Sequence, residues 1–231
     1  MLALPVPTER QQLGTQPVQW QSDSTLSLHD VDFKYDDDQL ALKHINIDVH
    51  GYQRIGIIGA SGSGKSTLIN LLGGFLTPVA DQGKIQVNGQ TVSHLSQDAW
   101  QQSFFYIPQN PYLFHATLAE NIAFYQPDAS RQAIERAAEN AGLTAWIATL
   151  PAGLDTAIGE GSRGVSGGQA QRIALARAFL DDSRRVLLFD EPTAHLDIET
   201  EAELKTTILP VLDNHLVFFA THRLHLSLIH I

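Results

Sequence analysis

The chain has 231 residues, which is enough for one large or two small domains with a sizeable core. Its 43% hydrophobic and 17% charged residues are typical of a globular protein, and its net charge of −10 argues against an open nucleic-acid groove. The lack of cysteine excludes disulfides, thiol catalysis and cysteine-based zinc sites. Because we find no run of about 18 apolar residues and no signal-peptide pattern, we expect a soluble domain of the cytoplasmic type.

Residues 1–22 contain three prolines and five glutamines with little periodicity, so we expect a linker that follows something larger upstream. The next segments alternate between apolar and polar residues, as strands do. A phase shift after Leu28 indicates a bulge in the first of them, and Asn88-Gly89 predicts a type I′ hairpin turn. The expected strands cover residues 26–33, 42–49, 54–58 and 84–89.

The pattern changes near Ser96, where a helical turn over 96–102 and a short strand over 104–107 are expected. Residues 117–150 are largely helical in pattern, with Ser130 as a helix N-cap and Gly142 as a helix end. This stretch predicts a helical subdomain, at about residues 98–157, inserted into the rest of the domain.

The remainder of the chain alternates again between helix and strand. We expect helices over 169–180 and 198–209, and strands over 186–189 and 215–220. The strand over 186–189 is apolar at every position, which is typical of the interior of a parallel sheet.

The segment between the strand 54–58 and the next helix fits the phosphate-loop pattern G-x-x-x-x-G-K-[ST]. Glycines let successive N–H groups face one point, and the helix N-terminus adds partial positive charge there. Lys65 can then reach the β- and γ-phosphates of ATP, and the Ser66 hydroxyl can hold Mg²⁺. The alternative, a flexible Gly/Ser linker, does not explain the apolar segments on both sides. The expected nucleotide-binding residues of this loop are Gly59, Ser61, Gly62, Ser63, Gly64, Lys65, Ser66 and Thr67.

The second chemical signal is Asp190-Glu191 at the end of the apolar strand. Carboxylates at the carboxyl ends of parallel strands lie at the crevice where nucleotides bind. Asp190 would position Mg²⁺, and Glu191 would polarise the water that attacks the γ-phosphate. A solvated acidic turn is the alternative for this pair alone, but the phosphate loop disfavours it.

The third signal, Val165-Ser166-Gly167-Gly168-Gln169, resembles the L-S-G-G-Q signature of ABC-transporter ATPases, with Val165 in place of leucine. A helix start of this kind makes a second anion cradle without a lysine. The resemblance implies a head-to-tail dimer, in which each ATP lies between one domain's phosphate loop and the other's signature. Ser166, Gly167, Gly168 and Gln169 are then expected to contact the partner's ATP.

The other motifs of this family match in order from about residue 24. The resemblance implies that Tyr35 stacks on adenine, although an edge-strand core aromatic is the alternative. It implies that Gln109 senses Mg²⁺ and the attacking water, and that His222 is the switch histidine at the γ-phosphate. Residues 194–197 resemble the loop that communicates across the dimer, and Glu160 resembles part of the exporter loop that contacts the membrane domain.

Two features resemble exporters rather than importers: the segment 111–122 and the N-terminal linker. Residues 159–169 look most like a subunit of the heterodimeric cysteine/glutathione exporters needed for cytochrome bd assembly. The end of the chain departs from the family, because a further strand and helices are expected after His222.

The resemblance implies a P-loop NTPase fold of the α/β class, with a parallel sheet, a small antiparallel β subdomain and an inserted α-helical subdomain. Residues 23–231 would form the nucleotide-binding domain of an ABC exporter. Its ATP hydrolysis, with Mg²⁺, would drive export at the cytoplasmic face of the inner membrane. The expected partners are a transmembrane domain and a second nucleotide-binding domain, in a heterodimer, with no nucleic acid. The alternatives are a soluble ABC-type ATPase and a nucleotide-gated interaction module without turnover.

Overall fold

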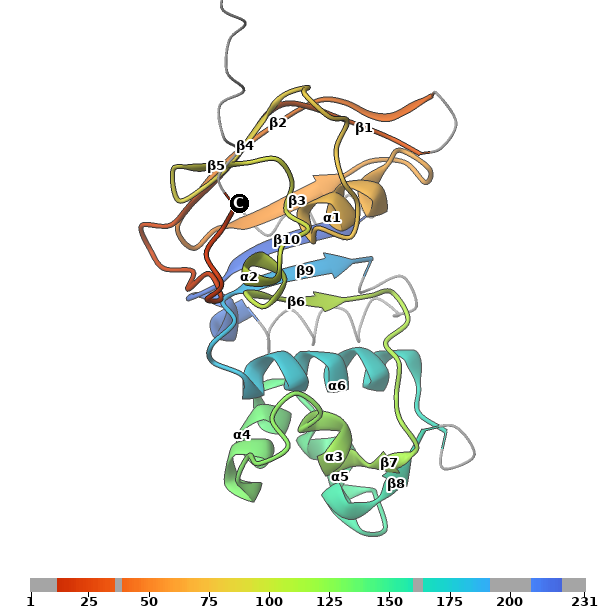
Figure 1. The fold of residues 1–231 in the computed structure, drawn as a ribbon. Coiled ribbons are helices and arrows are strands. Elements are labelled where there is room, and N and C mark those ends of the chain that lie inside the picture. Colours follow the sequence, from red (N-terminus) through yellow and green to blue (C-terminus); the bar gives the residue numbers. More distant parts are fainter. Residues whose placement is uncertain (1–11, 36–38, 160–163, 192–208, 222–231) are drawn as a thin grey trace, which may run out of the picture.

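The computed structural model describes residues 12–35, 39–159, 164–191 and 209–221. Figure 1 shows an antiparallel sheet, a parallel sheet below it, and helices beneath the parallel sheet. The antiparallel sheet has the strand order β2-β1-β4-β5, and the parallel sheet has the order β3-β10-β9-β6. The predicted α/β class, with both kinds of sheet and a helical part, is confirmed.

The antiparallel sheet holds three of the predicted strands, those over residues 26–33, 42–49 and 84–89, together with the short strand β5. Its strands are β1 (Thr25–Lys34), β2 (Leu40–His50), β4 (Lys84–Val87) and β5 (Gln90–Val92). The register of β1 against β2 shifts between Leu28 and Val31, which confirms the predicted bulge. Asn88 and Gly89 both have positive φ, at 50° and 78°, as a type I′ turn requires.

The parallel sheet brings together strands that are far apart in the sequence. Its central strands are β9 (Val186–Asp190) and β10 (Leu216–Thr221), and its outer strands in the described residues are β3 (Arg54–Ile58) and β6 (Phe104–Ile107). In-register pairing puts Ile58 beside Thr221 and Ala220 beside Asp190. The carboxyl ends of β3, β10 and β9 therefore meet at one edge, where ligands bind in open α/β sheets.

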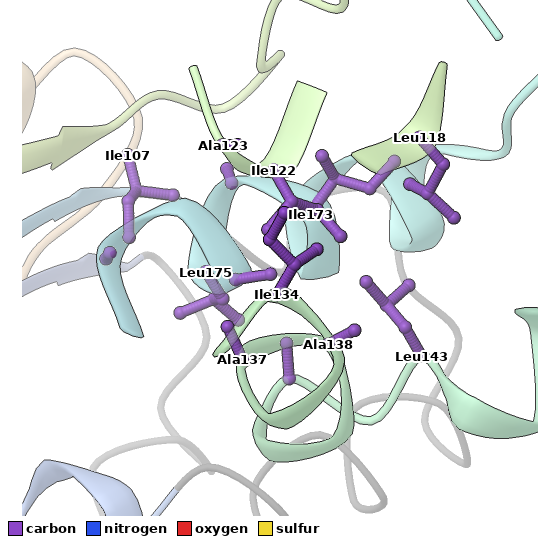
Figure 2. Packing of buried hydrophobic residues seen from close by; sticks show 14 of the residues in the cluster. Ile107, Leu118, Ile122, Ala123, Ile134, Ala137, Ala138, Leu143, Ile173 and Leu175 are labelled. Carbon is purple, nitrogen blue, oxygen red and sulfur yellow. The ribbon is translucent and has the colours of Figure 1, made fainter. Parts of the chain in front are cut away.

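Helix α6 (Gly167–Leu180) lies between the parallel sheet and the smaller helices (Figure 1). It is buried from Ala170 to Ala178, because the sheet covers one side and helices cover the other. Ile173 and Leu175 point into this core with Ile134, Ala137 and Ile107 (Figure 2). The other helical and short elements are α1 (Lys65–Leu72), α2 (Asp98–Gln101), β7 (Ala116–Thr117), α3 (Leu118–Ile122), α4 (Arg131–Asn140), α5 (Thr144–Ala148), η1 (Gly153–Asp155), β8 (Ala157–Ile158) and η2 (Leu209–Leu212).

Two helix ends in this layer follow the sequence prediction. The Ser130 hydroxyl accepts a hydrogen bond from the Ala133 amide at 3.2 Å, as expected of the N-cap of α4. Gly142 adopts a positive φ of 71° just after α4, which ends that helix as predicted.

The described part of the N-terminal segment, residues 12–22, packs against the domain. Trp20 is 2% exposed, and its Nε1 donates a hydrogen bond to the Gly51 carbonyl at 2.9 Å. Its ring meets Trp100 of α2 edge to face, at 6.2 Å between centroids. The amide of Val18 donates to the Ala99 carbonyl at 2.9 Å. The segment therefore holds the antiparallel sheet and α2 together.

Candidate nucleotide-binding site

The predicted phosphate loop lies between β3 and α1, as the sequence indicated. Gly64 precedes α1 with a φ of 93°, a conformation that side chains rarely adopt. A Cβ atom on Gly59 would lie 2.4 Å from the Ser63 hydroxyl, so a side chain there would displace that hydroxyl from its position in the loop. Helix α1 begins at Lys65, inside the predicted phosphate loop. Its free N-terminal amides thus lie within the loop, where they can bind an anion.

Lys65 lies at the centre of this loop and is 6% exposed. Its Nζ donates a hydrogen bond to the Ala60 carbonyl at 2.9 Å and lies 3.5 Å from Oε1 of Glu191. A buried ammonium costs free energy unless acidic or carbonyl groups surround it. These two neighbours therefore hold the Lys65 side chain within the loop, where phosphate oxygens would bind.

Asp190 joins the phosphate loop to the parallel sheet. The Ser66 hydroxyl donates to Oδ1 of Asp190 at 2.8 Å, and the Tyr106 hydroxyl donates to Oδ2 at 3.3 Å. Burial raises the pKa of Tyr106 to about 12, and the negative charge of Asp190 acts in the same direction. The phenol thus stays protonated near neutral pH and remains a donor. Sequence reasoning missed Tyr106, because its contact depends on β6 lying beside β9.

Glu191 follows Asp190 with a positive φ of 49°. Such a conformation is uncommon for a residue other than glycine. The Glu191 amide donates to the Ala220 carbonyl at 3.0 Å, which fixes the turn against β10. This turn directs the carboxylate back to Lys65 instead of along the sheet edge.

A cleft with a volume of about 630 Å³ runs along this edge. Tyr35 is 50% exposed at the cleft, and its hydroxyl is 3.1 Å from that of Thr67. Gln109 also lines the cleft. Its backbone carbonyl accepts a hydrogen bond from Nε2 of Gln171, on α6, at 2.8 Å. The cleft thus brings together predicted residues from both sheets and from the segment after β6. Its lining residues are Tyr35, Gln39, Leu40, Ala41, Ser61, Gly62, Gly64, Lys65, Ser66, Thr67, Gln109 and Glu191.

The predicted signature residues lie at the start of α6 and do not line this cleft. The Ser166 hydroxyl accepts from the Gln169 amide at 3.2 Å, while Oε1 of Gln169 accepts from the Ser166 amide at 2.9 Å. This reciprocal capping box starts the helix two residues before the predicted start at 169. Ser166 and Gly167 are both exposed. The start of α6 therefore offers an open surface to a second molecule.

Two predicted residues and one segment lie outside the described residues: His222, Glu160 and the segment 194–197.

The fit of Mg²⁺ can be judged from the donors at the site. Ser66 and Asp190 supply a hydroxyl and a carboxylate oxygen within hydrogen-bonding distance of each other. In the part of the chain that the structure describes, no cluster of three or more His, Asp or Glu side chains could hold a metal by itself. Mg²⁺ commonly binds one or two protein oxygens and completes its shell with phosphates and water. These residues therefore fit Mg²⁺ that arrives together with a nucleotide.

Comparison with known proteins identifies what this arrangement resembles. A protein-family model described as "ABC transporter" matches residues 42–194. The chain is 56% identical over 199 residues to the glutathione/L-cysteine transport system ATP-binding/permease protein CydC of Bacillus subtilis (strain 168), covering 82% of this chain and 35% of that protein. It is 36% identical over 200 residues to the ATM1-type heavy metal exporter of Novosphingobium aromaticivorans, covering 87% of this chain and 32% of that protein.

A solved structure of a bacterial Atm1-family ABC exporter with ATP bound superimposes with a TM-score of 0.80. It is 34% identical to this chain and covers 94% of it, and the match covers 38% of that exporter chain. The chain thus spans about a third of the length of the curated relatives described above. No helix of the described residues has the length and apolar character that crossing a membrane requires.

Proposed function

We propose that this chain, which belongs to the ABC transporter family, is the ATP-hydrolysing motor domain of an exporter. The prediction of family membership is thereby confirmed, and the chain resembles the ATPase domains of exporters in particular. Export itself, its cargo and its partners are properties of the whole relative, of whose length this chain matches about a third.

The observation that carries the proposal is the meeting of Lys65, Glu191 and the Ser66–Asp190 pair at one sheet edge. Lys65 would leave the Ala60 carbonyl to bind β- and γ-phosphate oxygens, where its charge stabilises the charge that develops during transfer. Glu191 would then accept the proton of the water that attacks the γ-phosphate. The 3.5 Å between Lys65 Nζ and Glu191 Oε1 supports these two roles, because the base and the electrophilic group have to act on the same small volume.

Mg²⁺, when bound with ATP, would neutralise charge on the β- and γ-phosphates. Ser66 would coordinate the ion, Asp190 would hold it through a water molecule, and Gln109 would reach it from the segment after β6. On the family resemblance, we assign His222 to the γ-phosphate and Tyr35 to the adenine ring. The half-exposed ring of Tyr35 at the cleft supports that assignment.

Two such domains would close around ATP, each presenting its signature to the other's phosphate loop. The exposed Ser166 and Gly167 support this arrangement, because a signature buried against its own domain could not reach a second nucleotide. We propose that residues 23–231 form this domain, with the helical subdomain at about 98–157 and residues 1–22 as a linker from a transmembrane domain. ATP binding would close the pair, and hydrolysis would reopen it.

We further propose a heterodimeric exporter of small thiols, working from the cytoplasmic face of the membrane. The support is the identity of 56% to a glutathione/L-cysteine transport protein, against 36% to the heavy metal exporter. Transport of labelled cysteine and glutathione into inverted vesicles tests this cargo. Transport of neither would reject it and leave the ATPase proposal standing.

The decisive experiment for hydrolysis replaces Glu191 with Gln in the whole protein that carries this chain. Phosphate release should fall at least about 100-fold, because the amide cannot accept the proton of the attacking water. ATP affinity, measured by fluorescent-nucleotide titration, should persist, because Lys65 and the loop remain. Normal turnover in this variant would contradict the assignment.

The two alternatives predict other results. A nucleotide-gated module without turnover would bind ATP but release no phosphate even before Glu191 is replaced. A soluble ABC-type ATPase would release phosphate while remaining in the soluble fraction of cells.

A further inference from the structure

Gln171 lies on α6 two residues beyond the signature, and the proposed chemistry leaves it without a role. It is 4% exposed. Its Nε2 donates to the Pro108 carbonyl at 2.9 Å and to the Gln109 carbonyl at 2.8 Å. Both partners are acceptors, so the amide nitrogen must face them and its orientation is fixed. Gln171 thus holds the backbone of the proposed Mg²⁺-sensing glutamine directly.

The side-chain oxygen of Gln171, in contrast to its nitrogen, lacks a hydrogen bond. Its Oε1 is buried and has no hydrogen-bond partner among the described residues. A buried polar atom without a partner lowers stability. Burying Gln171 therefore costs stability at Oε1. The two hydrogen bonds that its Nε2 donates to residues 108 and 109 are what this position provides in return.

A second contact from α6 holds the same segment at its far end. Arg177 donates to the Tyr112 carbonyl at 2.9 Å. Between these contacts, Ile173 and Leu175 pack in one core with Ile107 (Figure 2). The backbone from residue 108 to 112 is thus attached to α6 at both ends, and a displacement of α6 would carry it along.

We infer that Gln171 is a positioning residue that ties the placement of Gln109 to the signature end of α6. The inference rests on the proposed function. When the exposed start of α6 binds a partner's nucleotide, the helix would move as a body. Gln171 would then shift the Gln109 backbone within the chain's own cleft. One ATP site would in this way sense whether the other is filled.

The first test is Gln171→Met, which keeps the length of the side chain and removes its donor. In the whole protein, kcat should fall about tenfold or more, because misplacing a positioning group costs turnover. KM and nucleotide affinity should change less than about twofold, since the phosphate loop is untouched. The matched control is Gln132→Met, an exposed glutamine of α4, which should behave as the unmodified protein. A loss of affinity equal to the loss of kcat would overturn the inference.

A double-mutant cycle with Gln109→Ala separates positioning from a general structural effect. If Gln171 acts through Gln109, then Gln171→Met should cost little further kcat once Gln109 is alanine. Fully additive losses would overturn the inference.

A spectroscopic readout covers a variant that lacks measurable turnover. This chain has no cysteine, so a cysteine at the exposed Asn110 gives one spin-label position in it. In Gln171→Met, or in Gln171→Glu should the first fail to fold, the label should be more mobile than in the unmodified protein. An identical spectrum would overturn the inference. If the unmodified protein released no phosphate, the proposed function would be rejected instead. The spin label would still test the contact between Gln171 and the backbone of residues 108 and 109.

Discussion

At the scale of single residues, the site depends on how the Asp190 carboxylate is shared between two hydroxyl groups. Ser66 holds one oxygen from the phosphate loop, and Tyr106 holds the other from β6. The rings of Phe75 and Tyr106 pack edge to face, with 5.4 Å between their centroids. This contact limits the rotation of the Tyr106 ring. Tyr106 therefore fixes the plane in which Asp190 faces the proposed Mg²⁺ position.

Tyr106→Phe tests this geometry by removing one oxygen atom. We expect the Mg²⁺ concentration needed for half-maximal phosphate release to rise by about tenfold, because a lost hydrogen bond to a charged group costs about 1.5 kcal/mol. Nucleotide binding in EDTA should stay unchanged. Tyr125→Phe, which removes a hydroxyl from another ring of the same protein, is the matched control. An unaltered Mg²⁺ dependence would show that Asp190 needs no second donor.

His215, the residue directly before β10, gives a pH-dependent prediction. Burial lowers its pKa from 6.5 to about 4, and the nearby Arg185 guanidinium acts in the same direction. The unfolded chain thus binds a proton at higher pH than the folded one, so stability present above pH 6.5 is lost as the pH falls towards 4. The loss approaches about 3 kcal/mol at most. In urea unfolding, the free energy of unfolding of His215→Phe should fall less between pH 6.5 and pH 4 than that of the unmodified protein. An equal fall in both proteins would show that His215 is not the group responsible.

At the scale of elements, α6 is the helix on which the layers depend. Arg177 reaches from it to the Asn121 carbonyl at 2.7 Å, the Asn121 Oδ1 at 3.0 Å and the Tyr112 carbonyl at 2.9 Å. Its guanidinium also faces the rings of Phe114 and Phe124, at 5.6 and 5.9 Å. Burial lowers the pKa of this guanidinium, so the contacts must offset the cost of a buried charge.

Arg177→Met should lower the free energy of unfolding by about 3 kcal/mol, because three hydrogen bonds of the guanidinium are lost, two of them buried. Arg177→Lys should lower the free energy of unfolding by less, since lysine keeps the positive charge but lacks the several N–H donors of the planar guanidinium. Urea unfolding measures both, with Arg136→Met, an exposed arginine of α4, as the control. Equal stability of Arg177→Met and Arg136→Met would contradict this role for α6.

Local patterns sufficed for the phosphate loop, the strand before Asp190 and the N-cap at Ser130, because each depends on neighbours in the sequence. The contacts of Tyr106 and Gln171 could not be predicted. They depend on β6 lying beside β9 and on the rotation of α6, and neither follows from periodicity in one chain. The start of α6 was placed too late, because Gly167 and Gly168 resemble a loop until the capping box is seen.

At the scale of the whole molecule, the N-terminal segment connects parts that the sequence pattern treated separately. Its prolines and glutamines predicted a linker, yet residues 12–22 bind both the antiparallel sheet and α2. The Leu13 amide donates to Oε1 of Gln97 at 2.7 Å, and Gln90 Nε2 donates to the Gln12 carbonyl at 2.6 Å. A displacement of this segment would therefore be transmitted to the nucleotide-binding domain through Trp20.

Trp20→Ala tests this attachment. We expect a loss of about 3–5 kcal/mol in urea unfolding, because a fully buried indole and its bond to Gly51 are removed. Limited proteolysis should then cut within residues 12–22 before it cuts the rest of the domain. Trp146→Ala is the control: Trp146 of α5 is only partly buried, so it should cost less and leave the N-terminal segment protected. Protection of residues 12–22 in Trp20→Ala would mean that the backbone bonds of Val18 and Leu13 hold the segment by themselves.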